Sequence, residues 1–120
     1  TKKILSGEPI PVFNNGDMKR DFTFIDDIII GTRSAIDNNY SCEIFNLGNN
    51  KSEKLLDMIR LIEKELGKKA KIDFMPMQLG DVKESFADIN KSKEKLNFFP
   101  KISINKGIPE FIKWYIEFNK

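Results

Sequence analysis

The sequence predicts an α/β protein, because short strand-like runs alternate along it with segments of helical periodicity. The clearest helix lies in residues 55–66, where apolar residues three and four positions apart form one stripe and Gly67 follows as a C-cap. The clearest strands are the apolar runs Glu43–Gly48 and Lys71–Met75. These three observations fix the fold class.

The first elements resemble a short hairpin. Residues 10–13 predict a strand, and Pro9 and Pro11 place it at an edge because proline donates no backbone hydrogen bond. Residues 14–17, Asn-Asn-Gly-Asp, tolerate positive φ and predict a turn, and residues 18–25 suit the returning strand.

A helix is expected next, with Asp26 or Asp27 as its N-cap and Ile36 near its end. The strand Glu43–Gly48 should then join a parallel sheet, which requires neighbouring strands. The sequence offers few such neighbours, so we expect most of that sheet to be missing.

The remaining elements complete a set of about four helices. Ser52 is the expected N-cap of the helix in residues 55–66. A short helix should start at Asn90 or Ser92 and end at Leu96, and a final helix should begin near Ser103.

Composition restricts the classes of function. The 120 residues suffice for one domain, residues 1–120, with one core. The net charge of +2 comes from intermixed acids and bases, which does not favour a nucleic-acid partner.

There is no histidine and Cys42 is the single cysteine, so a His-ligated zinc site and an internal disulfide are excluded. No apolar run approaches the ~20 residues of a membrane span, and we expect a cytoplasmic protein without a membrane partner.

Three segments in order carry a family resemblance. They are the stretch from Arg20 to Asp27, the run Phe45-Asn46-Leu47-Gly48, and Gly80-Asp81 followed by Ala87-Asp88. Together they resemble the extended short-chain dehydrogenase/reductase family of nucleotide-sugar epimerases and dehydratases, over nearly the whole chain. Residues 18–23 and 77–78 are most similar to its UDP-glucuronate 4-epimerases.

The resemblance implies a UDP-sugar as ligand. Arg20 would clamp the diphosphate through its rigid fork of donors, although a salt bridge with Asp21 or Asp17 is the alternative. Asp81 would accept hydrogen bonds from the ribose hydroxyls, or else be a simple turn residue. Gln78 stands where many relatives have an arginine, and its neutral amide makes a weaker contact, which favours the glucuronate subgroup.

Apolar positions of the same resemblance imply contacts to the base. Pro11 and Phe13 match the segment that lines the uracil pocket. Phe22 lies at a nearby family position, where stacking on a base and simple core packing are equally compatible with the sequence.

The family's chemistry needs residues that the sequence does not contain. Relatives transfer a hydride at the sugar C4 through NAD, which requires a glycine-rich turn at a helix N-terminus and a Tyr-x-x-x-Lys pair. Tyr40 and Tyr115 are the only tyrosines, and Ile44 and Asn119 stand four residues later. No catalytic residue and no cofactor-binding residue is therefore assigned, and NAD is expected in a missing N-terminal domain of the full-length protein.

We therefore expect a C-terminal substrate-binding fragment that is inactive alone and lacks most of the Rossmann sheet. Residues 43–48 would be the last strand of the missing domain's sheet. The fragment would self-associate through that strand or the helix at residues 28–36, and the full-length protein would be a homodimer.

Several functions stay open. The first is a UDP-glucuronate 4-epimerase that supplies surface polysaccharide precursors. A dTDP-glucose 4,6-dehydratase or a UDP-glucuronate decarboxylase is the alternative in the same class. A truncated, non-catalytic module that binds a nucleotide sugar or a protein is the alternative in another class.

Overall fold

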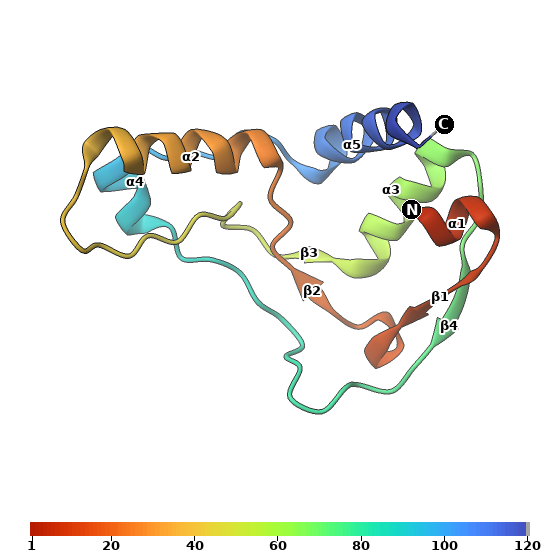
Figure 1. Cartoon of the computed structure of the whole chain (residues 1–120). Helices are drawn as coiled ribbons and strands as arrows, with labels where there is room; N and C mark the ends of the chain where they lie inside the picture. The colour runs from red at the N-terminus through yellow and green to blue at the C-terminus, as the bar shows by residue number, and fades with distance from the viewer. Residues whose placement is uncertain (120) are drawn as a thin grey trace.

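A computed structural model describes residues 1–119 and confirms the α/β class, with five helices and few strands among these residues (Figure 1). The elements, in order, are α1 (Lys2–Ser6), β1 (Pro9–Val12), the 3-10 turn η1 (Phe13–Gly16), β2 (Lys19–Arg20), α2 (Ile25–Asn38), β3 (Glu53–Lys54), α3 (Leu55–Leu66), β4 (Lys71–Phe74), α4 (Asn90–Leu96) and α5 (Ile104–Phe118).

The expected hairpin is wrong. β1 pairs in parallel with β4, with Val12 opposite Phe74, whereas β2 pairs antiparallel with β3. Asn14 and Asn15 do adopt positive φ, at 48° and 51°, but they form a 3-10 turn after which residues 17–20 run beside residues 81–84. The residue types that permit a hairpin turn also permit this turn, so local composition did not determine the pairing.

Residues 43–48 form no strand in the described part of the chain. Side chains hold this segment instead: Ser92 donates its hydroxyl to the Asn46 carbonyl at 2.6 Å, and the Asn46 amide donates to the Asp88 carbonyl at 3.2 Å. Phe45 and Leu47 pack against buried residues near α4. The segment is therefore fixed in place without a backbone partner, although its pattern is that of a strand.

Helix α2 differs from expectation at its start. Its N-cap is Phe24, in an extended conformation, and Asp26 and Asp27 lie inside the first turn. Asp27 is buried, and its carboxylate accepts the backbone N–H groups of Lys101 and Ile102 at 2.9–3.1 Å. Asp27, a predicted N-cap, therefore binds the segment before α5 to α2 through these hydrogen bonds.

The later helices agree with the sequence. Gly67 ends α3 with φ of 62°, and Ser103 precedes α5 as its N-cap residue. Lys54, not Ser52, is the N-cap of α3. Helix α1 was not expected, because five residues are too few for a periodic pattern. None of the helices within residues 1–119 is long and apolar enough to cross a membrane.

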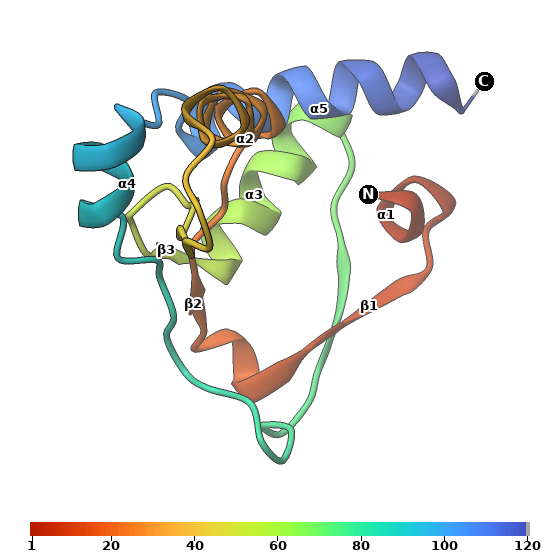
Figure 2. The same cartoon turned by 60° about the vertical axis from the view of Figure 1, so that its left-hand side comes forward.

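Buried residues form two clusters instead of the single expected core. One joins α1, α3 and α5 through Ile4, Ile62 and Ile112. The other consists of residues in and beside α4, against which Ala35 of α2 packs: Ile89, Leu96 and Phe98. In Figure 1, α2 and α4 lie on the left and α1, α3 and α5 on the right, and the start of α2 lies beside α3 and α5 (Figure 2). The radius of gyration of 16.6 Å exceeds the about 13.6 Å of a compact chain of this length.

Candidate nucleotide-sugar site

The site is built on two segments that are distant in sequence and adjacent in space. The Met75 N–H donates to the Val12 carbonyl at 2.9 Å, and the Lys19 N–H donates to the Lys83 carbonyl at 2.9 Å. Residues 11–20 therefore run beside residues 73–85. This arrangement brings Pro11, Phe13 and Arg20 on one segment alongside Gln78 and Asp81 on the other.

Arg20 and Asp81 contact each other directly. The Arg20 Nη2 lies 2.7 Å from the Asp81 Oδ1, and both side chains are only about a third exposed or less, at 27% and 32%. The predicted pairing of Arg20 with Asp21 or Asp17 does not occur. Two residues that the family resemblance assigns to the ligand thus form one charged pair between the two segments.

Backbone carbonyls complete the surroundings of the guanidinium. Its Nη1 donates to the carbonyls of Lys19 at 2.7 Å and Lys83 at 3.3 Å. An arginine has five N–H donors. Within the described residues, these contacts and the bond to Asp81 use three, which leaves the Nε–H and one Nη2 hydrogen for a ligand.

Two further ion pairs cross between the segments. The Lys83 Nζ lies 2.6 Å from Asp17, and the Lys19 Nζ lies 3.2 Å from Glu84. The hydrogen bond and the charge of Asp17 raise the pKa of Lys83 above its ordinary value. With the pair of Arg20 and Asp81, three cations face three anions, so the formal charge of this strip is zero.

The other sequence-based candidates occupy different surroundings. Phe13 is half-buried at the start of η1, whereas Pro11 and Gln78 are exposed. The Gln78 carbonyl accepts the Asp81 N–H at 3.3 Å, which helps to set the turn that presents Asp81. These residues lie on the two site segments, as expected, but none of them contacts Arg20 by a hydrogen bond among the residues described.

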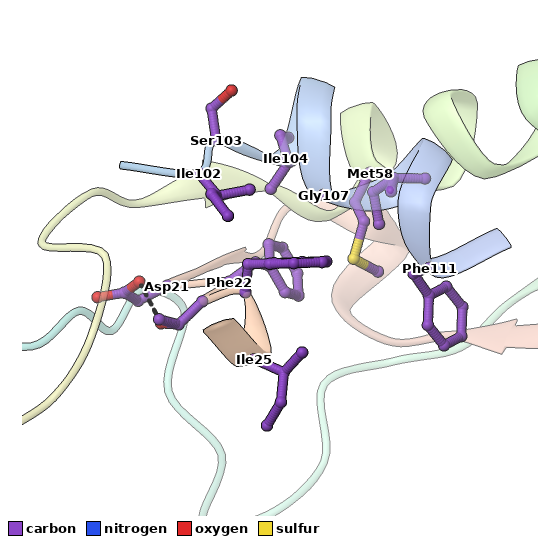
Figure 3. A pocket seen from close by; sticks show the side chains of 12 residues that line it. Asp21, Phe22, Ile25, Met58, Ile102, Ser103, Ile104, Gly107 and Phe111 are labelled. Atoms are coloured by element: carbon purple, nitrogen blue, oxygen red, sulfur yellow. Dashed lines mark hydrogen bonds between the residues drawn. The ribbon is translucent and has the colours of Figure 1, made fainter. Parts of the chain in front are cut away.

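Phe22 points into a separate apolar cavity of about 380 Å³ between the start of α2, α3 and α5. Figure 3 shows Asp21 at one end of this cavity and Phe111 at the other, with Phe22, Met58 and Ile104 between them. Phe22 is half-buried and lines this cavity, whereas Arg20 does not. Sequence analysis missed the cavity because its walls come from three helices.

A second hollow, of about 260 Å³, lies directly beside Arg20. Its walls include Leu47, Gly48 and the run from Ser85 to Ala87, and it shares Asp21 and Thr23 with the apolar cavity. The position of Gly48 beside the site could be suspected from its motif, but its contacts could not.

The N-termini of α2 and α3 do not suit the pyrophosphate of NAD. The first turn of α2 carries Asp26 and Asp27, and that of α3 carries Asp57, so a pyrophosphate at either N-terminus would meet carboxylates. Tyr40 donates its hydroxyl to the Lys95 carbonyl at 2.9 Å, and Tyr115 lies within α5. Among residues 1–119, no group of three or more acidic residues or cysteines is arranged to bind a metal ion.

A family model described as GDP-mannose 4,6 dehydratase matches residues 1–111. This chain belongs to that family. Within it, the predicted resemblance to the nucleotide-sugar epimerases and dehydratases of the extended short-chain dehydrogenase/reductase group is confirmed.

This chain is similar to both characterised and uncharacterised proteins. An uncharacterised protein of Methanocaldococcus jannaschii is 49% identical over 97% of this chain and 36% of its own length. A UDP-glucuronate 4-epimerase of Thermodesulfobacterium geofontis is 40% identical over 94% of this chain and 35% of its own length. The chain thus spans about a third of the length of these curated relatives.

A solved structure shares the fold. The UDP-glucuronic acid 4-epimerase of Bacillus cereus, in complex with UDP-glucuronic acid and NAD, superposes with a TM-score of 0.83. It is 34% identical, and the match covers 95% of this chain and 38% of that one. The fold of this family member is therefore that of one part of such an enzyme.

Proposed function

We propose that this chain is the UDP-sugar-binding portion of an NAD-dependent 4-epimerase that converts UDP-glucuronate to UDP-galacturonate. The observation that carries the proposal is the contact of Arg20 with Asp81 at 2.7 Å across two segments. Its support is the similarity to UDP-glucuronate 4-epimerases of Thermodesulfobacterium geofontis and Bacillus cereus.

In this proposal Arg20 binds the diphosphate. A guanidinium presents parallel N–H donors to phosphate oxygens, and two donors of Arg20 are left for such a ligand among the described contacts. Asp81 accepts hydrogen bonds from the ribose hydroxyls, and the exposed Gln78 amide adds a neutral contact. Asp81 contacts Arg20, so one nucleoside diphosphate could bind Arg20 through its phosphates and Asp81 through its ribose.

The base would lie toward β1 and η1. Pro11 is exposed and Phe13 is half-buried there, so both have surface that a uracil ring can cover. Phe22 faces the apolar cavity instead, and its position favours the packing role over stacking on the base.

NAD and the hydride transfer belong, in this proposal, to a cofactor-binding domain that residues 1–119 do not form. Residues 43–48 would add to the sheet of that domain, because the segment has the composition of a strand and no backbone partner within the described chain. The chain alone would bind a nucleotide sugar without turnover. The full-length protein would be a cytoplasmic homodimer that supplies surface polysaccharide precursors.

A second candidate is a non-catalytic module that binds a nucleotide sugar. Its support is that neither Tyr40 nor Tyr115 is followed by a lysine four residues later, and that the Tyr40 hydroxyl donates to the Lys95 carbonyl at 2.9 Å. A dTDP-glucose 4,6-dehydratase or UDP-glucuronate decarboxylase is the alternative within the enzyme class. The neutral Gln78 favours the glucuronate epimerases over both.

The test is calorimetric titration of the chain with UDP and with UDP-glucuronate. Arg20→Ala should weaken UDP binding by ten-fold or more, because a charge-assisted hydrogen bond contributes about 1.5–3 kcal/mol. The matched control is Arg33→Ala, since Arg33 is exposed on α2 and its one ion pair within residues 1–119 is with Asp37 in the same helix. Equal UDP affinity of Arg20→Ala and the parent chain would refute the diphosphate role of Arg20.

A further inference from the structure

Asp21 binds three segments together at the edge of the candidate site. Its Oδ1 accepts the Asn49 N–H at 2.8 Å and the Thr23 hydroxyl at 3.3 Å. Its Oδ2 accepts the Asn50 N–H at 3.0 Å and the Ala87 N–H at 3.2 Å. One carboxylate thus satisfies three backbone donors from two segments that lie far from it in sequence.

Ser85 donates its N–H to the Lys19 carbonyl at 3.3 Å, but among the described residues the backbone N–H groups of Asn49, Asn50 and Ala87 are joined to the β2 segment through Asp21. Strand β2 is only two residues long, and residues 85–88 belong to no helix or named strand. A carboxylate accepts through two oxygens, and bonds to ionised acceptors are roughly twice as strong as neutral ones. Asp21 therefore supplies a connection that the short β pairing does not.

Gly48 shows how closely the three segments approach. A Cβ at this position would lie 2.5 Å from the Ala87 Cβ and 2.8 Å from the Asp21 Oδ2. Neither neighbour is the far end of a long, flexible side chain, so any other residue would force the segments apart. Because Gly48 has no side chain, its backbone can lie close to Ala87, and the Asp21 carboxylate binds the Ala87 N–H at the same place.

This contact shapes the hollow beside Arg20. The hollow is lined by Leu47 and Gly48 from one of the segments and by residues 85–87 from the other. Arg20 and Asp21 are consecutive, so the group that draws both segments inward also fixes the backbone that carries the guanidinium. The position of Arg20 relative to its walls thus depends on Asp21.

We infer that Asp21 is a positioning residue for nucleotide-sugar binding: it holds the Asn49–Asn50 and Ala87 backbones against β2 and so sets the place of Arg20. This inference rests on the proposed function for its ligand. It assigns Asp21 no contact with the ligand itself.

The test uses Asp21→Asn, which keeps the size of the side chain but leaves one acceptor oxygen and turns an NH2 group toward backbone donors. In ligand-free protein, NMR should show the amide protons of Asn49, Asn50 and Ala87 displaced, together with the Arg20 Nε–H. UDP affinity should fall by roughly ten-fold, as expected if the displaced Arg20 loses one charge-assisted hydrogen bond to the diphosphate. Asp21→Glu, which restores the charge, should recover part of the affinity.

Asp27→Asn is the matched control, because Asp27 also holds remote backbone N–H groups, those of Lys101 and Ile102, but lines neither hollow. It should lower thermal stability and leave UDP affinity unchanged. The inference is overturned if Asp21→Asn leaves the Arg20 Nε–H in place, or if its UDP affinity equals that of Asp27→Asn. If the parent does not bind UDP, the proposed function fails, and the Nε–H signal alone still decides the role of Asp21.

Discussion

At the scale of single residues, the candidate site combines a cation with its own counter-anion. Arg20 lies 2.7 Å from Asp81, and the neighbouring pairs of Lys83 with Asp17 and Lys19 with Glu84 leave the strip with no net formal charge. A phosphate group that approaches Arg20 therefore meets the Asp81 carboxylate as well. Asp81 is expected to oppose the phosphates electrostatically while it binds the sugar of the nucleoside.

Asp81→Ala should separate these two effects. Without the carboxylate, inorganic pyrophosphate should bind more tightly because Arg20 loses its competing anion, whereas UDP should bind more weakly because the ribose loses its acceptor. Calorimetry with both ligands measures the two directions in one variant. Asp17→Ala, which releases Lys83 instead, should leave UDP affinity near that of the parent. Tighter binding of both ligands by Asp81→Ala would contradict a ribose role.

Residue patterns identified some of this site and not all of it. Arg20 and Asp81 stood in recognisable motifs, and their contact across the two segments agrees with that selection. The sequence suggests for Asp21 only a salt bridge with Arg20, whereas its partners in the structure are backbone N–H groups 28, 29 and 66 residues away. Every residue except proline has a backbone N–H, so the residue types of these partners do not indicate that they bind a carboxylate.

At the scale of elements, α4 is joined to the segment that follows α2 by one acid and two lysines. Glu43 pairs with Lys91 and, at 2.6 Å, with Lys95. The two lysines lie 5.2 Å and 5.4 Å from the ring centres of Phe45 and Tyr40. Hydrogen bonds from Lys91 and then Lys95 lower the pKa of Glu43 from 4.5 to about 2.

The stabilisation from Glu43 should therefore depend on pH. A lowered pKa means that the contribution is fully present above pH 4.5 and is lost as the pH falls toward 2. The parent should have a higher melting temperature than Glu43→Gln at pH 7, and the difference should vanish on acidification through this range. Glu94→Gln, an exposed acid on the same helix, is the control. A difference that persists at pH 2 would count against the ion pairs.

Helices were easier to predict than strand pairing, for a physical reason. The stripe in α3 and the positive φ of Gly67 are local properties, so the sequence specifies them directly. The pairing of β1 with β4 joins residues about sixty positions apart, and nothing within residues 9–25 indicates that partner. The hairpin prediction is wrong because a turn composition determines the local backbone and not the strand with which β1 pairs.

At the scale of the whole molecule, α2 presents an apolar outer face. Ile25, Ile29 and Ile36 are 58%, 56% and 67% exposed, and Thr32 completes a spacing of four, three and four residues. Such spacing places all four side chains on one side of a helix. The face suits packing against another helix, and a second copy of the chain offers the same face.

We therefore expect the chain to self-associate in solution. Light scattering should give a mass that rises with protein concentration, and Ile29→Lys should restore the monomer mass because it places a charge in the centre of the face. Phe118→Lys is the control, since Phe118 is 74% exposed at the far end of α5. A monomer mass for the parent over a wide concentration range would refute this expectation.

The pairing of β1 with β4 has a consequence for the entropy of the chain. Bringing Val12 beside Phe74 closes a loop of about sixty residues, which costs on the order of 4 kcal/mol by loop-closure scaling. A ligand that contacts both Arg20 and Asp81 joins the same two segments, 61 residues apart. It would act as a reversible cross-link and offset part of that entropic cost, so occupancy of the site and integrity of the fold are thermodynamically coupled.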